Sequence, residues 1–264
     1  MRSSSSSSSS SRITETTHYL PNSSAKCKIV DHESQLGVII CHPWGLLGGN
    51  MNNNVVIALA QFFMRMGITT LRMDFAGRQI GRGYGEVDQV VEASNFLLQN
   101  KHDEMNSRSN QGPPTCLLLV GYSYGSLITG SATAKIPRCI GTISVAPPFG
   151  VSHWLLLFNS SYHSKQSQAR SQLYRLFVIG EHDNFTSTDT FLKAIESYET
   201  SRSTHKVLPK LDHFFARQEY RIIHEVDLWL RQTFSSSQSK NDKNISFRDN
   251  DFSIYINESD SQTT

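Results

Sequence analysis

Short apolar runs alternate with amphipathic segments through the middle of the chain. Runs rich in branched residues predict strands buried on both faces, because a parallel strand in an α/β sheet meets helices on either side. The clearest runs cover residues 37–42, 68–74, 116–122, 140–146 and 173–180. Two weaker candidates cover residues 27–31 and 205–208.

The segments between these runs have helical periodicity. They cover residues 53–66, 86–99, 124–134, 187–198 and 216–234. In the last segment the helical spacing predicts which face packs on the sheet. That face contains Tyr220, Ile223, Asp227, Leu230 and, beside them, Trp229. The alternation predicts an α/β fold with a mostly parallel central sheet and helices on both faces.

Polar segments bracket this pattern at both ends. Residues 1–12 are almost pure serine, and residues 235–264 hold too few apolar side chains to form a core. We therefore expect one folded domain over residues 13–234 between two disordered tails. Residues 101–114 are also polar and predict a surface insertion. The stretch between residues 147 and 172 is the only room for a cap, which predicts a minimal one.

Composition narrows the class of partner. The formal net charge is +2, and no Lys/Arg cluster stands beside stacking aromatics, so neither nucleic acid nor an anionic membrane is expected. No apolar stretch approaches the ~20 residues that cross a bilayer, and the serine-rich start does not have the pattern of a secretory signal. The four cysteines form neither a CxxC pair nor a zinc-site spacing with histidine. This favours free thiols, no metal, no cofactor and a cytoplasmic location.

Residues 121–125 read GYSYG and match the G-x-S-x-G pattern of a nucleophile elbow. An apolar run leads into them and a helix-compatible segment follows, which is the context that the pattern requires. Ser123 would lie on a tight strand-to-helix turn, where a side chain at either glycine would collide with neighbouring elements. Such a turn lifts the hydroxyl clear of the sheet and directs the helix N-terminus at a developing oxyanion. An ordinary strand–turn–helix with an incidental serine is the competing interpretation.

Candidate partners for this serine follow it in the chain, in the order acid and then histidine that α/β-hydrolases have. Asp183 comes just after a predicted strand, on the rim of the sheet where the elbow lies, and is the preferred acid. Glu181 and Asp189 are the alternates. His213 lies in the loop after the last predicted strand, where it can take the serine proton and return it. The structural alternatives are a capping aspartate and a surface histidine.

A second backbone N–H for the oxyanion would come from the loop after an early strand. That loop reads HPWGLLGG from His42 on, and its glycines allow the backbone to approach a substrate closely. We expect the N–H of Trp44, paired with that of Tyr124, to bind the oxyanion. Phosphate binding is the competing interpretation, but neither G-x-G-x-x-G nor a GK[ST] ending is present. Asp74 and Arg78, in the segment DFAGR, precede the serine and are interpreted as a turn that supports this loop.

Six motifs in order resemble a family of small, cap-poor, bacterial-type α/β-hydrolases. They are HPWGLLGGNMNN (42–53), LRMDFAGRQIGRG (71–83), GYSYGS (121–126), SVAPPFG (144–150), GEHDNF (180–185) and LDHFF (211–215). The resemblance spans residues 37–230 and implies a triad of Ser123, Asp183 and His213 with hydrolase chemistry. It does not supply a substrate, because one fold hosts many activities. The family commonly has His-Pro-x-Pro in the first loop. Trp44 followed by glycine stands there here, which predicts a wider or differently shaped pocket entrance.

These residues predict two-step acyl transfer through the serine, with a small ester or thioester as substrate. The candidates for the pocket wall are Phe149, Trp154 and Phe214. The apolar segment that holds the first two could instead pack a short helix onto the core. A peptidase or amidase of the same fold is the alternative activity. A catalytically idle binding protein is the alternative of another class, and a broken triad or a blocked elbow would mark it.

Overall fold

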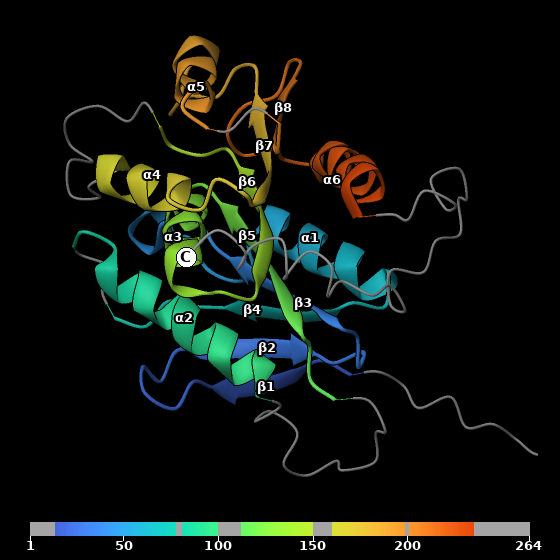
Figure 1. Cartoon of the computed structure of the whole chain (residues 1–264). Coiled ribbons are helices and arrows are strands. Elements are labelled where there is room, and N and C mark those ends of the chain that lie inside the picture. Colours follow the sequence, from blue (N-terminus) through green and yellow to red (C-terminus); the bar gives the residue numbers. More distant parts are fainter. Residues whose placement is uncertain (1–13, 78–80, 100–111, 150–159, 199–200, 235–264) are drawn as a thin grey trace, which may run out of the picture.

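The computed structural model describes residues 14–77, 81–99, 112–149, 160–198 and 201–234. The strands are β1 Thr16–Tyr19, β2 Lys26–Val30, β3 Leu36–Cys41, β4 Thr69–Met73, β5 Cys116–Tyr122, β6 Cys139–Val145, β7 Tyr174–Gly180 and β8 Ser203–Leu208. They form one eight-stranded sheet in the order β1-β2-β4-β3-β5-β6-β7-β8 (Figure 1). β2 pairs antiparallel with β1 and β4, and the other neighbours in this sheet pair in parallel.

Helices cover both faces of this sheet. They are α1 Asn54–Arg65, α2 Tyr84–Leu98, α3 Tyr124–Ala132, α4 Ser160–Gln168, α5 Thr188–Ile195 and α6 Glu219–Phe234, with 3₁₀ turns η1 Gly45–Leu47 and η2 Thr133–Lys135. α1 and α6 pack on one face, and α2 and α3 pack on the other, with α4 against α3 (Figure 1). The predicted fold class, a mostly parallel sheet between two helical layers, is confirmed.

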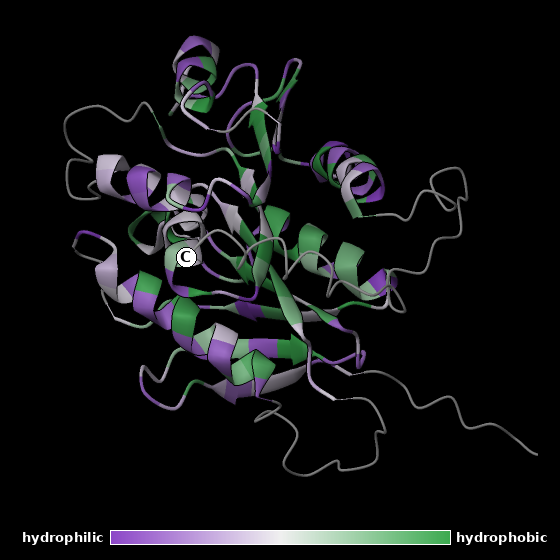
Figure 2. Cartoon of the chain, in the orientation of Figure 1, coloured by the Kyte–Doolittle hydropathy of each residue, from purple (hydrophilic) through white to green (hydrophobic). Residues whose placement is uncertain are grey.

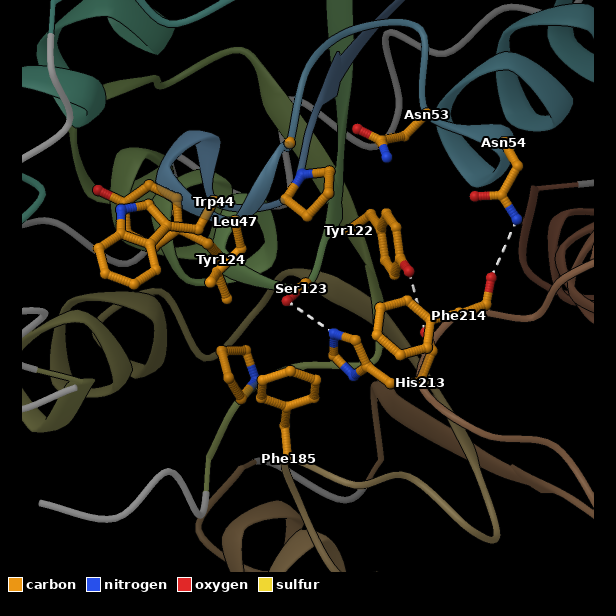
Figure 3. A pocket seen from close by; sticks show the side chains of 13 residues that line it. Trp44, Leu47, Asn53, Asn54, Tyr122, Ser123, Tyr124, Phe185, His213 and Phe214 are labelled. Atoms are coloured by element: carbon orange, nitrogen blue, oxygen red, sulfur yellow. Dashed lines mark hydrogen bonds between the residues drawn. The ribbon is translucent and has the colours of Figure 1, made fainter. Parts of the chain in front are cut away.

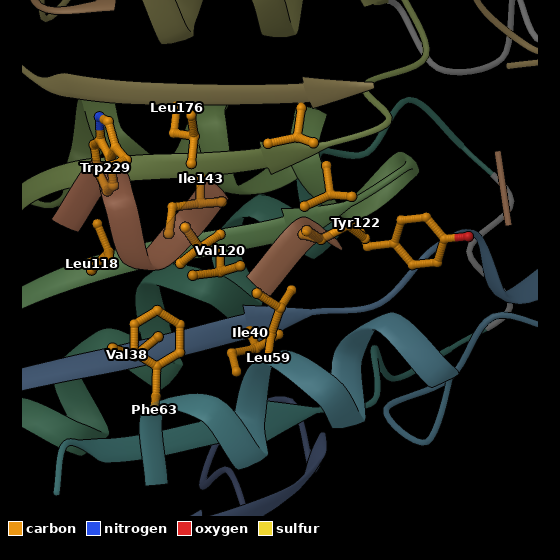
Figure 4. Packing of buried hydrophobic residues seen from close by; sticks show 14 of the residues in the cluster. Val38, Ile40, Leu59, Phe63, Leu118, Val120, Tyr122, Ile143, Leu176 and Trp229 are labelled. Carbon is orange, nitrogen blue, oxygen red and sulfur yellow. The ribbon is translucent and has the colours of Figure 1, made fainter. Parts of the chain in front are cut away.

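The central strands β3 and β5 have apolar side chains on both faces. Val38 and Ile40 belong to the cluster beneath α1 and α6 (Figure 4), whereas Ile39 faces α2 and α3. In β5, Leu118 and Leu119 divide in the same way. Because helices cover both faces, both alternating sets are apolar, and the strands read as continuous hydrophobic runs. This burial holds the carboxyl ends of β3 and β5 rigidly side by side.

The predicted strands and helices all occur, with strand ends shifted by at most two residues and helix ends by at most three. β1 and α4 were not predicted. β1 reads TTHY and lies at the sheet edge, where pairing with β2 rather than burial of side chains forms it. α4 is almost entirely polar, as its purple and white colours in Figure 2 show, and it packs on α3 through the buried His163 and Ser167.

The predicted packing face of α6 is wrong in part. The residues of this helix that are buried are Ile222, Val226, Trp229, Leu230 and Phe234. Tyr220 is 67% exposed, and Asp227 pairs with Arg231 on the outer side of the helix. The sequence of α6 allows two faces with helical spacing, one that begins at Tyr220 and one that begins at Ile222, and both include Trp229 and Leu230. Packing against α1 and the sheet selects the face that begins at Ile222.

All four cysteines are buried, and none of them forms a disulfide. Burial raises the pKa of the Cys27 thiol to about 12 and that of Cys139 to about 11, so neither is a reactive thiolate near neutral pH. Among the described residues, no three His, Cys, Asp or Glu side chains gather as a metal site would need. No helix in this part of the chain has the length and apolar character needed to cross a bilayer.

Candidate active site

Ser123 lies on a strained turn between β5 and α3. Its backbone has φ 53° and ψ −122°, a conformation that residues other than glycine rarely adopt. The turn needs both flanking glycines. A Cβ at Gly121 would lie 2.3 Å from the Gly125 oxygen, and a Cβ at Gly125 would lie 2.6 Å from the carbonyl oxygens of Cys41 and His42. The turn therefore brings the start of α3 against the loop that leaves β3.

Ser123, His213 and Asp183 form a continuous hydrogen-bonded chain. His213 Nε2 lies 2.9 Å from Ser123 Oγ, and His213 Nδ1 lies 2.7 Å from Asp183 Oδ2 (Figure 3). The three residues follow the carboxyl-terminal ends of β5, β7 and β8. These strands run parallel, so their carboxyl-terminal ends lie on the same side of the sheet. His213 and Asp183 are buried, whereas Ser123 is half-buried. The structure thus brings together the three residues that the chain order predicts.

The second carboxylate oxygen of Asp183 is held by the backbone. Asp183 Oδ1 accepts hydrogen bonds from the N–H groups of Phe185 at 2.8 Å and Thr186 at 3.0 Å. The alternate acids lie elsewhere. Glu181 accepts a bond from the N–H of Lys210, and Asp189 is an exposed residue in the first turn of α5. Of the three candidate acids, Asp183 is the one that contacts the histidine.

Two hydrogen bonds from other elements fix the backbone of the histidine loop. The Tyr122 hydroxyl donates to the carbonyl oxygen of His213 at 2.9 Å, and Asn54 Nδ2 donates to that of Phe214 at 2.9 Å (Figure 3). Burial raises the pKa of the Tyr122 hydroxyl, which keeps it a proton donor. Phe215, the next residue, has φ 51°. The bonds to the two preceding carbonyls support this strained backbone.

The loop after β3 is fixed by a buried histidine and an aspartate. His42 Nδ1 hydrogen-bonds to the carbonyl oxygen of Pro43, and its Nε2 accepts from the N–H of Phe75 at 3.1 Å. Asp74 Oδ1 accepts from the N–H of Met51 at 2.7 Å. Asp74 therefore holds the far end of the loop, as the interpretation of a supporting turn requires. The other residue of that interpretation, at position 78, lies outside the described residues.

A cleft that is partly open to solvent surrounds Ser123. Its lining is mostly apolar and aromatic, with two asparagines at one rim (Figure 3). The lining residues are Pro43, Trp44, Leu47, Gly49, Asn53, Asn54, Tyr122, Ser123, Tyr124, Pro148, Phe185, His213 and Phe214. Both residues expected to bind an oxyanion through their N–H groups, Trp44 and Tyr124, are among them.

The three candidate wall residues have different outcomes. Phe214 lines the cleft and is 52% exposed, with its ring centroid 5.6 Å from that of His213. Phe149 does not line the cleft, because it packs against Phe177 and Phe191 in a separate apolar cluster under α5. Trp154 lies outside the described residues.

A second aromatic wall, beside Phe214, was not predicted. Phe185 supplies it, with a ring centroid 4.3 Å from that of His213. Its position two residues after the candidate acid was the available signal. The asparagines of the rim, Asn53 and Asn54, stand in the motif that carries the family resemblance, but no pattern marked them as part of a pocket.

Comparison with protein-family models found no match for this chain. A curated relative, the uncharacterized protein RP471 of Rickettsia prowazekii, is 24% identical over 224 residues, which cover 78% of this chain and 87% of the relative.

Several solved structures share the architecture of this chain. XC6422 from Xanthomonas campestris, described as an α/β serine hydrolase without lid, has a TM-score of 0.64 at 21% identity and covers 86% of this chain and 97% of its own. ATU1826 from Agrobacterium tumefaciens, a candidate α/β hydrolase of unknown function, has a TM-score of 0.64 at 25% identity, covering 83% and 95%. The esterase Pf2001 of Pyrococcus furiosus has a TM-score of 0.64 at 14% identity, covering 84% and 91%.

Proposed function

We propose that this chain, whose fold places it in the α/β-hydrolase superfamily, is a serine hydrolase that forms an acyl-enzyme on Ser123. The observation that supports the proposal is the hydrogen-bonded chain from Ser123 through His213 to Asp183 at the base of an open cleft. A nucleophile, a base and a group that orients the base are the three parts of this chemistry.

The bonding pattern assigns the proton of the imidazole. A carboxylate oxygen can only accept, so the bond to Asp183 Oδ2 places the proton of His213 on Nδ1. Its Nε2 then has a free lone pair facing the Ser123 hydroxyl. In the first step, Oγ attacks the substrate carbonyl carbon and its proton passes to Nε2. Nε2 then gives this proton to the leaving alcohol or thiol as the ester bond breaks.

Water completes the reaction by the same route. It attacks the acyl carbon, gives a proton to Nε2 of His213, and the ester bond to Ser123 breaks as that proton returns to Oγ. Asp183 stabilises the imidazolium in both steps. Because two N–H groups hold its other oxygen, this carboxylate keeps one orientation throughout.

The N–H groups of Trp44 and Tyr124 bind the oxyanion in this proposal. Both residues line the cleft with Ser123, and the close approach at Gly125 brings the start of α3 against the loop that holds Trp44. Backbone donors fixed in this way need no reorganisation when the negative charge develops, which is what lowers the barrier.

A small ester or thioester is the substrate class that we propose. The cleft is lined largely by apolar and aromatic groups, which suit a neutral acyl group, and the named esterase among the similar structures supports ester chemistry. None of the four cysteines forms a disulfide, which supports the cytoplasm as its compartment, since disulfides rarely form there.

A fluorophosphonate probe tests the activated serine. We expect the wild-type protein to be labelled, and Ser123→Ala and His213→Ala to lose the label. Ser171→Ala, at an exposed turn before β7, is the matched control and should be labelled like wild type. A well-folded wild-type protein that takes no label would contradict the proposal and favour a binding protein with this fold.

A further inference from the structure

The cleft has two chemically different sides around Ser123. On one side lie Trp44 and Leu47, from the loop after β3 and from η1 (Figure 3). On the other side lie Tyr122 and Phe214, with Asn53 and Asn54 at the rim (Figure 3). An ester has two parts joined at the scissile bond, so a cleft of this kind can treat the acyl part and the alcohol part differently.

The orientation of the Asn53 amide is fixed by its own loop. Asn53 Oδ1 accepts a hydrogen bond from the N–H of Asn50 at 2.7 Å, which identifies the oxygen and leaves Nδ2 on the other side of the amide. Although Asn53 occupies the N-cap position of α1, its side chain does not cap the helix. Nδ2 points toward the cleft instead (Figure 3), and no acceptor in the described part of the chain bonds to it.

The other side-chain hydrogen-bond donors on this side already have acceptors. Asn54 Nδ2 donates to the carbonyl oxygen of Phe214 at 2.9 Å and to Glu219 Oε1 at 2.6 Å. The Tyr122 hydroxyl donates to the carbonyl oxygen of His213. Asn53 therefore differs from both, because its amide nitrogen points toward the cleft while its oxygen is held in place.

We infer that Asn53 is a specificity-determining residue, which binds an uncharged oxygen of the substrate on the side of the scissile bond away from Trp44. The inference rests on the proposed hydrolase function. It names the substrate class as uncharged esters with a second oxygen acceptor, such as an ether, hydroxyl or carbonyl oxygen. A carboxylate in that position would lose its hydration opposite a neutral donor, and such burial is costly without a cationic partner.

Two pairs of esters that differ only by an oxygen in place of a methylene test this inference. 4-Nitrophenyl methoxyacetate and 4-nitrophenyl butanoate place the change in the acyl part, whereas 2-methoxyethyl acetate and butyl acetate place it in the alcohol part. For each pair, the kcat/KM of the oxygen ester is divided by that of its hydrocarbon partner. Comparing this ratio between variants removes differences in the intrinsic reactivity of the esters.

Asn53→Asp is the informative variant. It keeps an oxygen for the N–H of Asn50 and the same shape, but replaces the two amide protons by a carboxylate oxygen. We expect the ratio to fall about tenfold in one of the two pairs, the size of one lost hydrogen bond. Asn54→Leu is the matched control at the same rim. It changes the overall rate through Phe214 but should leave both ratios as in wild type.

The outcomes separate the two proposals. Equal ratios in wild type and Asn53→Asp for both pairs, with all esters hydrolysed, would overturn the role of Asn53 and leave the hydrolase proposal standing. Labelling of Ser123 by a fluorophosphonate without hydrolysis of any of the four esters would overturn the substrate class alone. Absence of both labelling and hydrolysis would overturn both.

Discussion

One buried histidine lines the cleft and another directly precedes Pro43 in its wall, and the hydrogen-bond partners of the two rings differ in kind. His42 directly follows β3 and is 1% exposed. Both of its ring nitrogens hydrogen-bond to the backbone, one to the carbonyl of Pro43 and one to the N–H of Phe75. His213 lies in the loop after β8 and is 4% exposed, and both of its nitrogens bond to side chains, at Ser123 and Asp183. The two rings are thus equally buried but differently connected.

This difference separates a structural histidine from one that can transfer protons. A backbone carbonyl is too weak a base to take a proton from the ring, and a backbone N–H is too weak an acid to give it one, so they hold His42 in one neutral tautomer. Burial lowers the pKa of His42, opposed by its bond to Pro43 and by the charge of Asp74, and this also favours the neutral ring. A hydroxyl on one side and a carboxylate on the other allow His213 to take up a proton and be stabilised as a cation.

Removing each ring gives the largest contrast. We expect His213→Gln to lower kcat/KM about 10⁴-fold or more, because the general base is lost while the fold is retained. His42→Leu keeps the base and should lower kcat/KM by about 100-fold at most, through movement of the loop that holds Trp44. Steady-state kinetics with an ester substrate measures both values. Comparable losses in the two variants would remove the distinction between the rings.

The carboxylate partner of His213 gives the next largest effect. We expect Asp183→Asn to lower kcat by about 10³- to 10⁴-fold, because an amide nitrogen facing Nδ1 favours the tautomer that has no lone pair on Nε2. Glu181→Gln is the matched control, since its carboxylate bonds to the N–H of Lys210 and lies near His182, whereas His213 bonds to Asp183. A decrease of similar size in the control would count against Asp183 as the orienting group.

The stability of the protein should depend on pH through His42. The unfolded chain binds a proton at this residue near pH 6.5, whereas the folded protein, with its lowered pKa, binds it only at lower pH. The free energy of unfolding therefore falls as pH decreases from 7.5 to 5, by at most about 1.4 kcal/mol per pH unit for one such group. Burial lowers the pKa of His163 too, which adds a contribution of the same sign.

Urea denaturation of His42→Leu measures this contribution. The variant leaves the carbonyl of Pro43 and the N–H of Phe75 unsatisfied, which we expect to cost about 2–4 kcal/mol at pH 7.5. Its stability should also change less with pH than that of wild type, because the titrating ring is gone. An equal pH dependence in the two proteins would show that His42 is not the group that titrates.

The smallest effect concerns the support of the histidine loop. Tyr122→Phe removes the hydroxyl that donates to the carbonyl oxygen of His213, and we expect about a fivefold decrease in kcat with little change in KM. The rate of fluorophosphonate labelling should fall in parallel, because the position of the base rather than substrate binding is affected. A rise in KM at constant kcat would instead assign Tyr122 to the substrate wall.

The local features of this protein follow from its sequence. The ends of the buried strands were predicted to within two residues, because strands buried on both faces are apolar at nearly every position. The elbow was predicted because its steric demand for Gly121 and Gly125 acts within five residues. The order of serine, acid and histidine along the chain also indicated which strand ends would supply the partners.

Only the tertiary structure decided which side chains meet. Asp183 and Glu181 both follow β7, and the direction of each side chain, rather than its position in the chain, selects the partner of His213. Phe149 was expected in the cleft, but the space beneath α5 accommodates it.

The contact between Asn54 and Phe214 joins residues 160 positions apart, and the rim of the cleft depends on it. Periodicity and composition report how residues are buried within one element. They do not report how separate elements approach each other, because that depends on how side chains from all of them fill the same space.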